Sequence, residues 1–117
     1  MLFLIELDHV KSGTMLGPEA GQAFIEKIIF PTLTRAEELV KEEKILAGGA
    51  VLGRVALRFI AQADSLQEMD LIISSLPIWT VAETRVTPLI GLDDRRSHVQ
   101  KLLERVQELV EKPQPVE

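Results

Sequence analysis

Residues 76–89 read LPIWTVAETRVTPL, and this stretch decides the predicted fold. It begins with a Leu-Pro step, which favours a turn, and continues into β-branched residues, which favour a strand. It closes with Thr87 and Pro88, where we expect regular structure to stop because proline has no N–H to donate. Side chains alternate between the faces of a sheet, so the pattern predicts a strand with Glu83 and Arg85 on one face.

The rest of the chain supplies three more predicted strands and three predicted helices. The strands cover residues 2–8, 45–50 and 54–63, and the helices cover 19–44, 65–75 and 93–111. We expect Pro31 to kink or break the first helix around residues 29–30, because its ring clashes with the carbonyl four residues earlier. Ser65 and Glu68 form a capping-box pattern for the second helix, and Asp93 is the expected cap of the last one.

The element order predicts the fold class. Strand, helix, strand, strand, helix, strand is the split βαβ or ferredoxin-like order, here followed by an extra C-terminal helix. It gives an α+β fold with a four-stranded antiparallel sheet and two helices on one face, in which the first strand lies between the third and the fourth. We expect residues 1–92 to form this domain and residues 93–117 to form a C-terminal helix with a proline-containing tail.

Composition limits the function classes. A length of 117 residues suits one core, and the absence of cysteine excludes disulfides and thiolate chemistry. A net charge of −5 argues against nucleic acid or an anionic membrane surface as a partner. The first residues lack the basic start and cleavage site of a signal peptide, and no apolar run reaches membrane-spanning length. We therefore expect a cytoplasmic protein.

One face of the predicted sheet lacks a helical cover. It mixes apolar with charged residues: Leu4, Glu6, Asp8, Arg54, Arg58, Ile60, Val81, Glu83 and Arg85. A bare face of this kind is shielded when two sheets pack together, so we expect a homo-oligomer. In the ferredoxin-like order, Glu6 lies between Arg58 on one neighbouring strand and Arg85 on the other.

Two interpretations of these charges stay open. The first is a structural network of ion pairs inside a subunit interface. The second is a ligand pocket, in which Arg54, Arg58 and Arg85 bind a small carboxylate while Glu6 or Glu83 acts as the catalytic acid or base. Three arginines against two carboxylates leave one positive charge, which a carboxylated ligand would neutralise.

Other chemistry has weaker signals. His9 and His98 have no second ligand at metal spacing, so we expect no metal site. The glycines at 48, 49 and 53 match neither a phosphate loop nor a dinucleotide fingerprint, so we expect no cofactor.

Several short motifs resemble the muconolactone isomerase family over residues 1–92. They are MLF at 1–3 with Asp8, GR at 53–54, LPIW at 76–79 and VTPL at 86–89. The resemblance implies a ferredoxin-like domain of the dimeric α+β barrel type, in which sheets pair and dimers assemble into larger rings. It also implies a pocket on the open sheet face near the subunit contact, and a cofactor-free isomerisation of a small unsaturated lactone carrying a carboxylate.

The chain also departs from that family. Leu4 and Glu6 stand where the family carries polar or basic residues, and Val55 and Leu57 stand where it carries Tyr and Asn. Two alternatives therefore remain: a non-catalytic ligand-binding or assembly module, and a cofactor-free oxygenase-like relative. The last helix exceeds the family's short end, and its apolar stripe is expected to pack on a neighbouring subunit or over the edge of its own sheet.

Overall fold

The computed structural model describes residues 1–10 and 17–112, so the loop expected over residues 9–18 lies largely outside the described chain. The described elements are β1 (Leu2–His9), α1 (Gly17–Phe24), the π-helical turn η1 (Ile25–Ile29), α2 (Phe30–Lys41), β2 (Ile45–Ala50), β3 (Ala56–Gln62), α3 (Leu66–Ser74), the 3-10 turn η2 (Pro77–Val81), β4 (Ala82–Leu89) and α4 (Leu92–Glu111).

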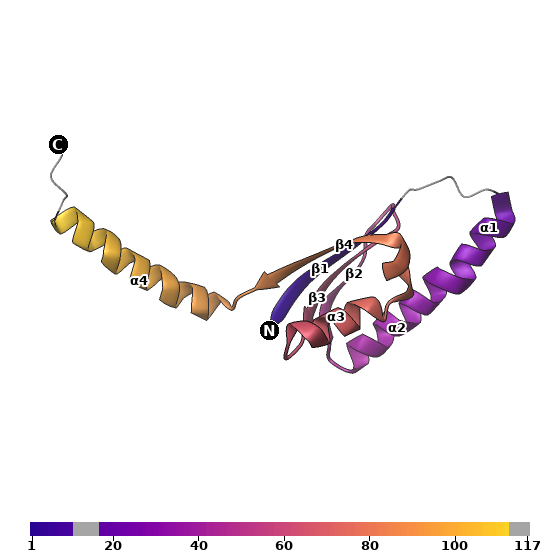
Figure 1. Ribbon diagram of the computed structural model, residues 1–117, viewed down its shortest axis with the longest axis horizontal. Coiled ribbons are helices and arrows are strands. Elements are labelled where there is room, and N and C mark those ends of the chain that lie inside the picture. Colours follow the sequence, from indigo (N-terminus) through magenta and orange to yellow (C-terminus); the bar gives the residue numbers. More distant parts are fainter. Residues whose placement is uncertain (11–16, 113–117) are drawn as a thin grey trace.

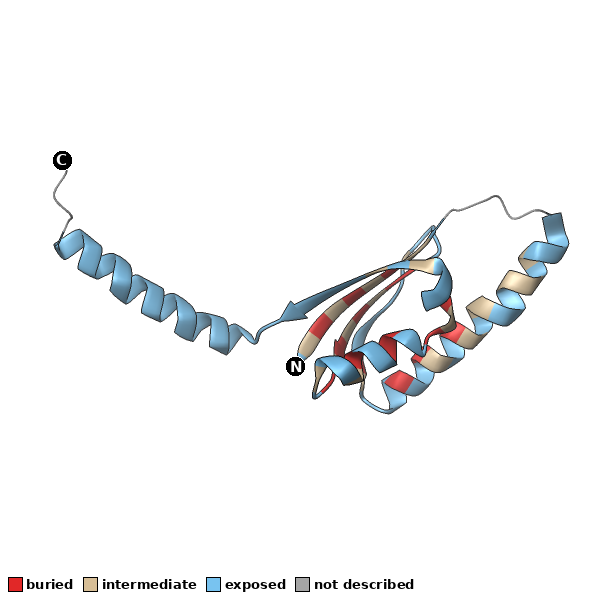
Figure 2. Ribbon diagram, in the orientation of Figure 1, coloured by how far each residue is buried: buried red, intermediate tan, exposed pale blue. Residues whose placement is uncertain are grey.

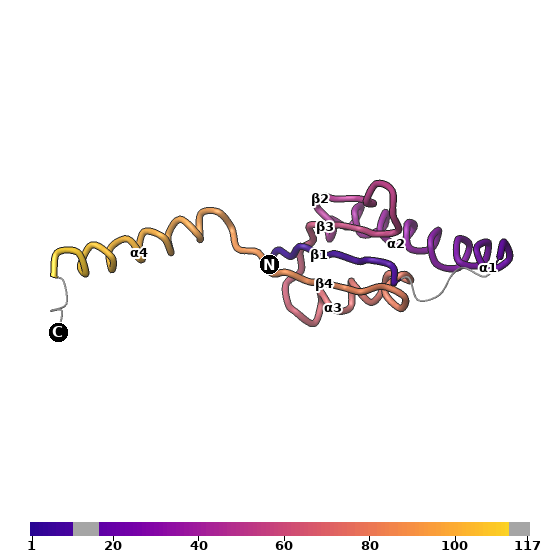
Figure 3. Tube along the Cα trace, turned by 90° about the horizontal axis from the view of Figure 1, so that it is seen from above, coloured from indigo at the N-terminus to yellow at the C-terminus, as the bar shows by residue number. Residues whose placement is uncertain are grey.

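The four strands form one antiparallel sheet in the order β2-β3-β1-β4. The view from above shows the strands side by side, with β1 between β3 and β4 (Figure 3). This is the predicted ferredoxin-like order, so the fold class is confirmed. Strands β2 and β4 are the two edges.

The core lies between the sheet and the helices on one face. Phe3, Ile5 and Leu7 of β1 are at most 2% exposed, while the residues between them are half-buried, which confirms the predicted alternation. They pack against buried side chains of α2, β3 and α3, which appear as red bands on the facing sides of these elements (Figure 2). Burial of such side chains stabilises each by roughly 1.5–3 kcal/mol.

Pro31 does not break the first helix, because helical residues run without interruption from Gly17 to Lys41; the expected disturbance before the proline takes the form of a π-helical turn. The π-helical turn η1 comes immediately before α2, and the N–H of Phe30 donates to the carbonyl of Ile25 five residues earlier. One extra residue in this turn lets the helix pass the proline ring. Thr32 follows, and its buried Oγ1 accepts a hydrogen bond of 2.9 Å from the N–H of Ile78, which ties α2 to η2.

The stretch at 76–89 differs from its prediction at both ends. Pro77–Val81 is a 3-10 turn instead of a strand, because Leu76 and Ile78 are drawn into the core at 2% exposure each. At the other end, β4 runs through Pro88 to Leu89. Proline is tolerated there because β4 is an edge strand and one of its sides has no neighbour to receive a donor.

A bulge in β2 depends on one glycine. Gly48 has φ +117°, and a Cβ built on it would lie 2.0 Å from the carbonyl oxygen of Arg58 on β3. The register between β2 and β3 shifts between Ile45 and Ala47, just before this contact. Gly49 has open space around the same position. Of these two neighbouring glycines, only Gly48 lies where a side chain would collide with the backbone of β3.

We predict that Gly48→Ala lowers the free energy of unfolding by about 3 kcal/mol, through backbone strain and a steric clash with β3. The matched control, Gly49→Ala, should change it by less than about 1 kcal/mol. Urea unfolding of the two variants and the wild type measures this. Equal stabilities of the two variants would contradict the geometry of the bulge.

Among the described residues, only Lys44 and Glu68, which form an ion pair at the start of α3, have clearly shifted pKa values. Ser65 Oγ accepts from the N–H of Glu68 at 3.0 Å, as the capping-box pattern predicts, while Glu68 Oε2 accepts from the N–H of Asp64 at 2.8 Å. Glu68 Oε1 also lies 2.6 Å from Lys44 Nζ. The hydrogen bond from Lys44, then that from the Asp64 amide, lower the pKa of Glu68 below its usual 4.5.

A lowered folded-state pKa contributes stability that is complete above the usual value and is lost as the pH falls through the folded value. We therefore predict that Glu68→Gln unfolds at a lower temperature than the wild type at pH 7. The difference should shrink as the pH falls below 4.5. Thermal unfolding monitored by circular dichroism between pH 7 and about pH 3 tests this. Asp70→Asn on the exposed side of α3 is the control, and the same pH trend there would contradict the assignment.

Helix α4 projects away from the sheet as an arm (Figure 1). All of its residues are exposed, so the alternative of packing over its own sheet edge is wrong. Its N-cap is Gly91, and Asp93 and Asp94 lie in the first turn, so Asp93 is not the cap. Carboxylates in this turn still favour the helix, because they face the positive end of its dipole. None of the described helices has the combined length and apolar character needed to cross a membrane.

Candidate functional site

The open face of the sheet carries a cluster of charged side chains on three neighbouring strands. Residues directly opposite each other in antiparallel strands share a face. Glu6 on β1 is opposite Arg58 on β3 and Arg85 on β4. Asp8 is opposite Glu83 on β4. The register therefore confirms the predicted position of Glu6 between Arg58 and Arg85.

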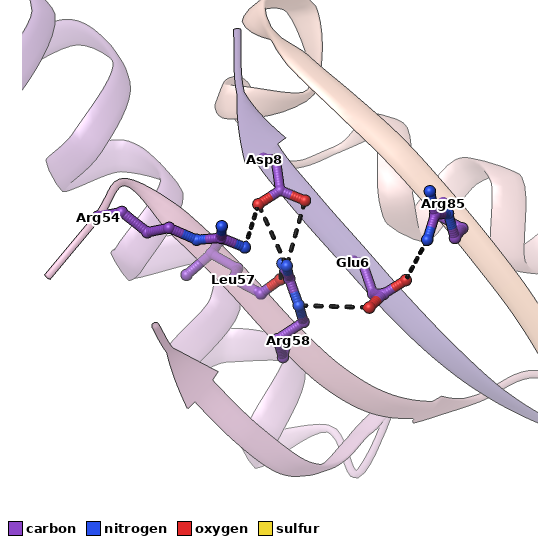
Figure 4. A network of polar contacts seen from close by, with 6 residues as sticks. All are labelled: Glu6, Asp8, Arg54, Leu57, Arg58 and Arg85. Carbon is purple, nitrogen blue, oxygen red and sulfur yellow. Dashed lines mark hydrogen bonds and ion pairs between the residues drawn. The ribbon is translucent and has the colours of Figure 1, made fainter. Parts of the chain in front are cut away.

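Glu6 contacts both of those arginines with different oxygens. Arg58 Nε lies 3.4 Å from Oε1, and Arg85 Nη1 lies 3.8 Å from Oε2. The side chain of Glu6 is 23% exposed and that of Arg58 is 30% exposed, whereas that of Arg85 is 80% exposed. Arg58 is therefore held inside the cluster, and Arg85 stands at its rim (Figure 4).

Asp8 is the second centre of the cluster. Its Oδ1 accepts from Arg54 Nη2 at 2.8 Å, and its two oxygens lie 3.2 Å each from Arg58 Nη2. Arg58 Nη1 also donates to the carbonyl of Leu57 at 2.9 Å, which fixes the guanidinium in place. Figure 4 shows Arg58 between the two carboxylates of Glu6 and Asp8.

Sequence reasoning placed Asp8 on this face but did not include it among the site residues. The signal was available, since Asp8 follows Glu6 by two residues in a strand and so shares its face. Arg54 joins the cluster by a route that alternation did not predict. The expected strand began at residue 54, but β3 begins at Ala56, so Arg54 lies in the turn before the strand and reaches Asp8 with its long side chain.

A shallow cleft of about 220 Å³ opens over these residues. Its lining consists of Glu6, Asp8, Arg58, Glu83, Thr84 and Arg85. Four of the five predicted site residues therefore share one cleft, and Arg54 lies outside its lining. Glu83 is exposed and, within the described chain, forms no ion pair. It is the one carboxylate of the cleft lining without a guanidinium partner among the described residues.

The formal charge of the cluster is balanced. Arg54, Arg58 and Arg85 are matched by Asp8 together with the two glutamates of the prediction, Glu6 and Glu83. The expected surplus of one positive charge is therefore wrong, because that count left Asp8 out.

The two histidines lie apart from the cluster's ion pairs. The ring of His9 packs at 4.8 Å from the ring of Phe24, and His98 lies on exposed α4. In the described part of the chain, no three His, Cys, Asp or Glu side chains are grouped so that they could hold a metal ion.

The fold is shared with solved structures. Muconolactone isomerase superposes with a TM-score of 0.61 at 20% sequence identity, covering 78% of this chain and 90% of that one. A second match is 5-chloro-2-hydroxyhydroquinone dehydrochlorinase (TftG) of Burkholderia phenoliruptrix AC1100 in complex with 2,5-dihydroxybenzoquinone. Its TM-score is 0.59 at 22% identity, covering 80% of this chain and 98% of that one.

These matches define the class of protein as an α+β protein with a ferredoxin-like sheet and the fold of muconolactone isomerase. The resemblance read from the sequence motifs is thereby confirmed at the level of the fold. No protein-family profile matches the chain, and no curated protein sequence matches it.

The different burial of the two arginines on Glu6 leads to a prediction. Arg58→Ala should lower the free energy of unfolding by about 2 kcal/mol, since it leaves two half-buried carboxylates without their shared donor. Arg85→Ala should lower it by less than about 0.5 kcal/mol, because an exposed pair contributes little. Chemical unfolding of both variants measures the difference. An equal loss would show that Arg58 does not hold the cluster together.

Proposed function

We propose that this chain is a muconolactone-isomerase-like protein that moves a proton on a small, unsaturated, carboxylated lactone without a cofactor. The observation that carries the proposal is the cleft on the open sheet face. There an exposed arginine, Arg85, and a carboxylate without an ion pair among the described residues, Glu83, lie two residues apart on the same strand face. The fold shared with muconolactone isomerase supports the same reaction class.

Arg85 is the residue that binds the carboxylate of the substrate. Its one ion pair in the described structure is a 3.8 Å contact with Glu6, so most of its N–H donors are free for a ligand. A guanidinium binds a carboxylate through two parallel hydrogen bonds, which fixes the orientation of a small molecule as well as its position. Arg58 is already engaged by Glu6, Asp8 and Leu57 and serves to position the others.

Glu83 is the residue that moves the proton. Isomerisation of a double bond removes a proton from one carbon and returns a proton to another, with no gain or loss of electrons. One carboxylate that alternates between its ionised and protonated forms is sufficient for both steps. Glu6, the other predicted acid or base, has both oxygens facing guanidinium groups and in this proposal holds Arg58 and Arg85 in place.

A second copy of the chain completes the site in this proposal. The cleft is shallow and its rim is exposed, so water reaches a ligand bound to one chain alone. Sheets of this kind bury an open face by packing against another sheet. Pairing over the open face would exclude water from the cleft and strengthen its electrostatic interactions.

A separate observation favours a second candidate function. Three arginines, Glu6 and Asp8 form one connected network of ion pairs, and Glu83 beside them brings the formal charge to zero, which lowers the cost of burying the cluster between two subunits. On this interpretation, the chain is a non-catalytic binding or assembly module, and the cluster sets the register of the interface. The oxygenase-like alternative stays a prediction that oxygen uptake with a polyphenol would test.

We predict that the wild type isomerises muconolactone in D₂O with incorporation of deuterium, and that Glu83→Gln lowers kcat by about a hundredfold or more. Arg85→Ala should mainly raise KM, since it removes binding of the substrate carboxylate. Proton NMR of the reaction mixture measures both. Glu104→Gln on α4 is the control and should behave as the wild type does.

Two results would contradict the proposal. If the wild type neither turns over nor binds small unsaturated carboxylates in titration calorimetry, the ion-pair interface becomes the better account. If turnover is present and survives Glu83→Gln but is lost in Glu6→Gln, the roles of the two glutamates are reversed.

A further inference from the structure

Helix α4 presents a continuous apolar stripe that no part of the described chain covers. Its members recur at intervals of three, four and seven residues and are between 45% and 87% exposed: Leu92, Val99, Leu102, Leu103, Val106, Leu109 and Val110. We call this set the α4 stripe. Glu104 and Glu108 lie on the opposite face of the helix. A stripe of this width is the surface that a helix normally buries against another element.

The body of the molecule, formed by the sheet and the helices before α4, has a groove that is apolar like the α4 stripe. A cavity of about 270 Å³ opens between α2 and the edge strand β2. Leu33 and Val40 of α2 and Leu46 of β2 contribute to its walls and are 39%, 54% and 48% exposed. We call it the α2–β2 groove. Apolar grooves of this kind are where amphipathic helices dock.

The lengths of the stripe and the groove agree. Residues 99–110 hold the dense part of the α4 stripe, and 12 helical residues rise about 18 Å. Helix α2 also has 12 residues and the same rise, and the six residues of β2 span about 20 Å. One wall of the groove is therefore as long as the stripe it would receive.

The two surfaces also carry opposite charges. Arg95 and Arg96 precede Val99 by four and three residues, so they share the side of the helix that carries the stripe. Glu43 follows the C-terminal end of α2, is exposed and, among the described residues, forms no ion pair. If α4 lies antiparallel to α2, the two arginines come beside the acidic C-terminal half of α2.

The occupant of the groove is a second copy, because the helix of the same chain points elsewhere. The groove lies at the β2 edge of the sheet, whereas α4 continues from β4 at the opposite edge. Only Ile90 and Gly91 connect β4 to α4, and two residues reach about 7 Å at most. Figures 1 and 3 both show α4 extending away from α2.

We propose that α4 of one copy docks in the α2–β2 groove of a second copy, antiparallel to α2, and that the second copy returns the same contact. The stripe fills the groove, and Arg95 and Arg96 pair with Glu43 at the C-terminal end of α2. This contact is separate from the open sheet face, so it holds whether or not the proposed isomerase activity does.

Disulfide trapping tests the contact directly, because the chain has no cysteine of its own. One full-length chain carries Val40→Cys in the groove. A second, distinguishable in mass, carries a single cysteine at Val99, Leu102 or Val106. All four positions are exposed, so the body should fold normally. After mixing and mild oxidation, we expect a covalent dimer of mixed mass from at least one stripe position, at about ten times the yield given by Glu104→Cys on the opposite face.

Charge reversal tests the proposed register with the same readout. Arg95→Glu with Arg96→Glu in the stripe chain should reduce the yield of the mixed dimer about tenfold, and Glu43→Arg in the groove chain should restore it. Lys101→Glu, on the opposite side of α4, is the matched control and should leave the yield unchanged.

Three outcomes would overturn the proposal. The first is a yield from every stripe position that does not exceed that of Glu104→Cys. The second is efficient disulfide formation between two stripe chains, which would show that α4 pairs with α4. The third is a loss on reversing Arg95 and Arg96 that Glu43→Arg does not restore, which would place another surface opposite the arginines.

Discussion

The pairing of β1 on both of its sides is the constraint on which the rest of the structure depends. A strand in the middle of a sheet has no freedom of register, because a shift by one residue would move all of its side chains to the opposite face. In β1 that shift would expose Phe3, Ile5 and Leu7 and bury Glu6 and Asp8 under the helices. The register that buries the apolar set therefore also fixes the carboxylates on the open face.

The charged cluster follows from this register and from the neighbouring strands. Glu6 meets one arginine on each side because β3 and β4 are both antiparallel to β1 and end up in register with it. The cluster therefore has a half-buried part and an exposed part. Arg58 donates hydrogen bonds to Asp8 and to the carbonyl of Leu57 and forms an ion pair with Glu6, whereas Arg85 and Glu83 lie at the exposed rim.

Two surfaces of the described chain lack cover, and the two proposed contacts would cover them. The open sheet face lacks a layer, and helix α4 has a stripe without a partner. The molecule extends 72 Å along its longest axis, far more than its 36 Å and 25 Å across, because of this arm. Pairing through the sheet face and docking of α4 use different surfaces. An assembly could therefore contain both, with the first completing the cleft and the second linking neighbouring units.

The sequence by itself determined the class of fold, the strand order and the faces of β1, because these follow from short-range periodicity and from motifs such as LPIW and VTPL. It also placed Glu6, Asp8, Arg58, Glu83 and Arg85 on the open face, because these residues alternate within strands. The tertiary structure decided the features that depend on contacts between residues far apart in the sequence. Ile78 is drawn into the core and turns Pro77–Val81 into a 3-10 turn, and the position of β4 at the edge lets the strand run through Pro88. Contacts across the sheet bring Arg54 from a turn to Asp8 and so balance the charge of the cluster, since only the folded chain places residues 46 positions apart within 2.8 Å.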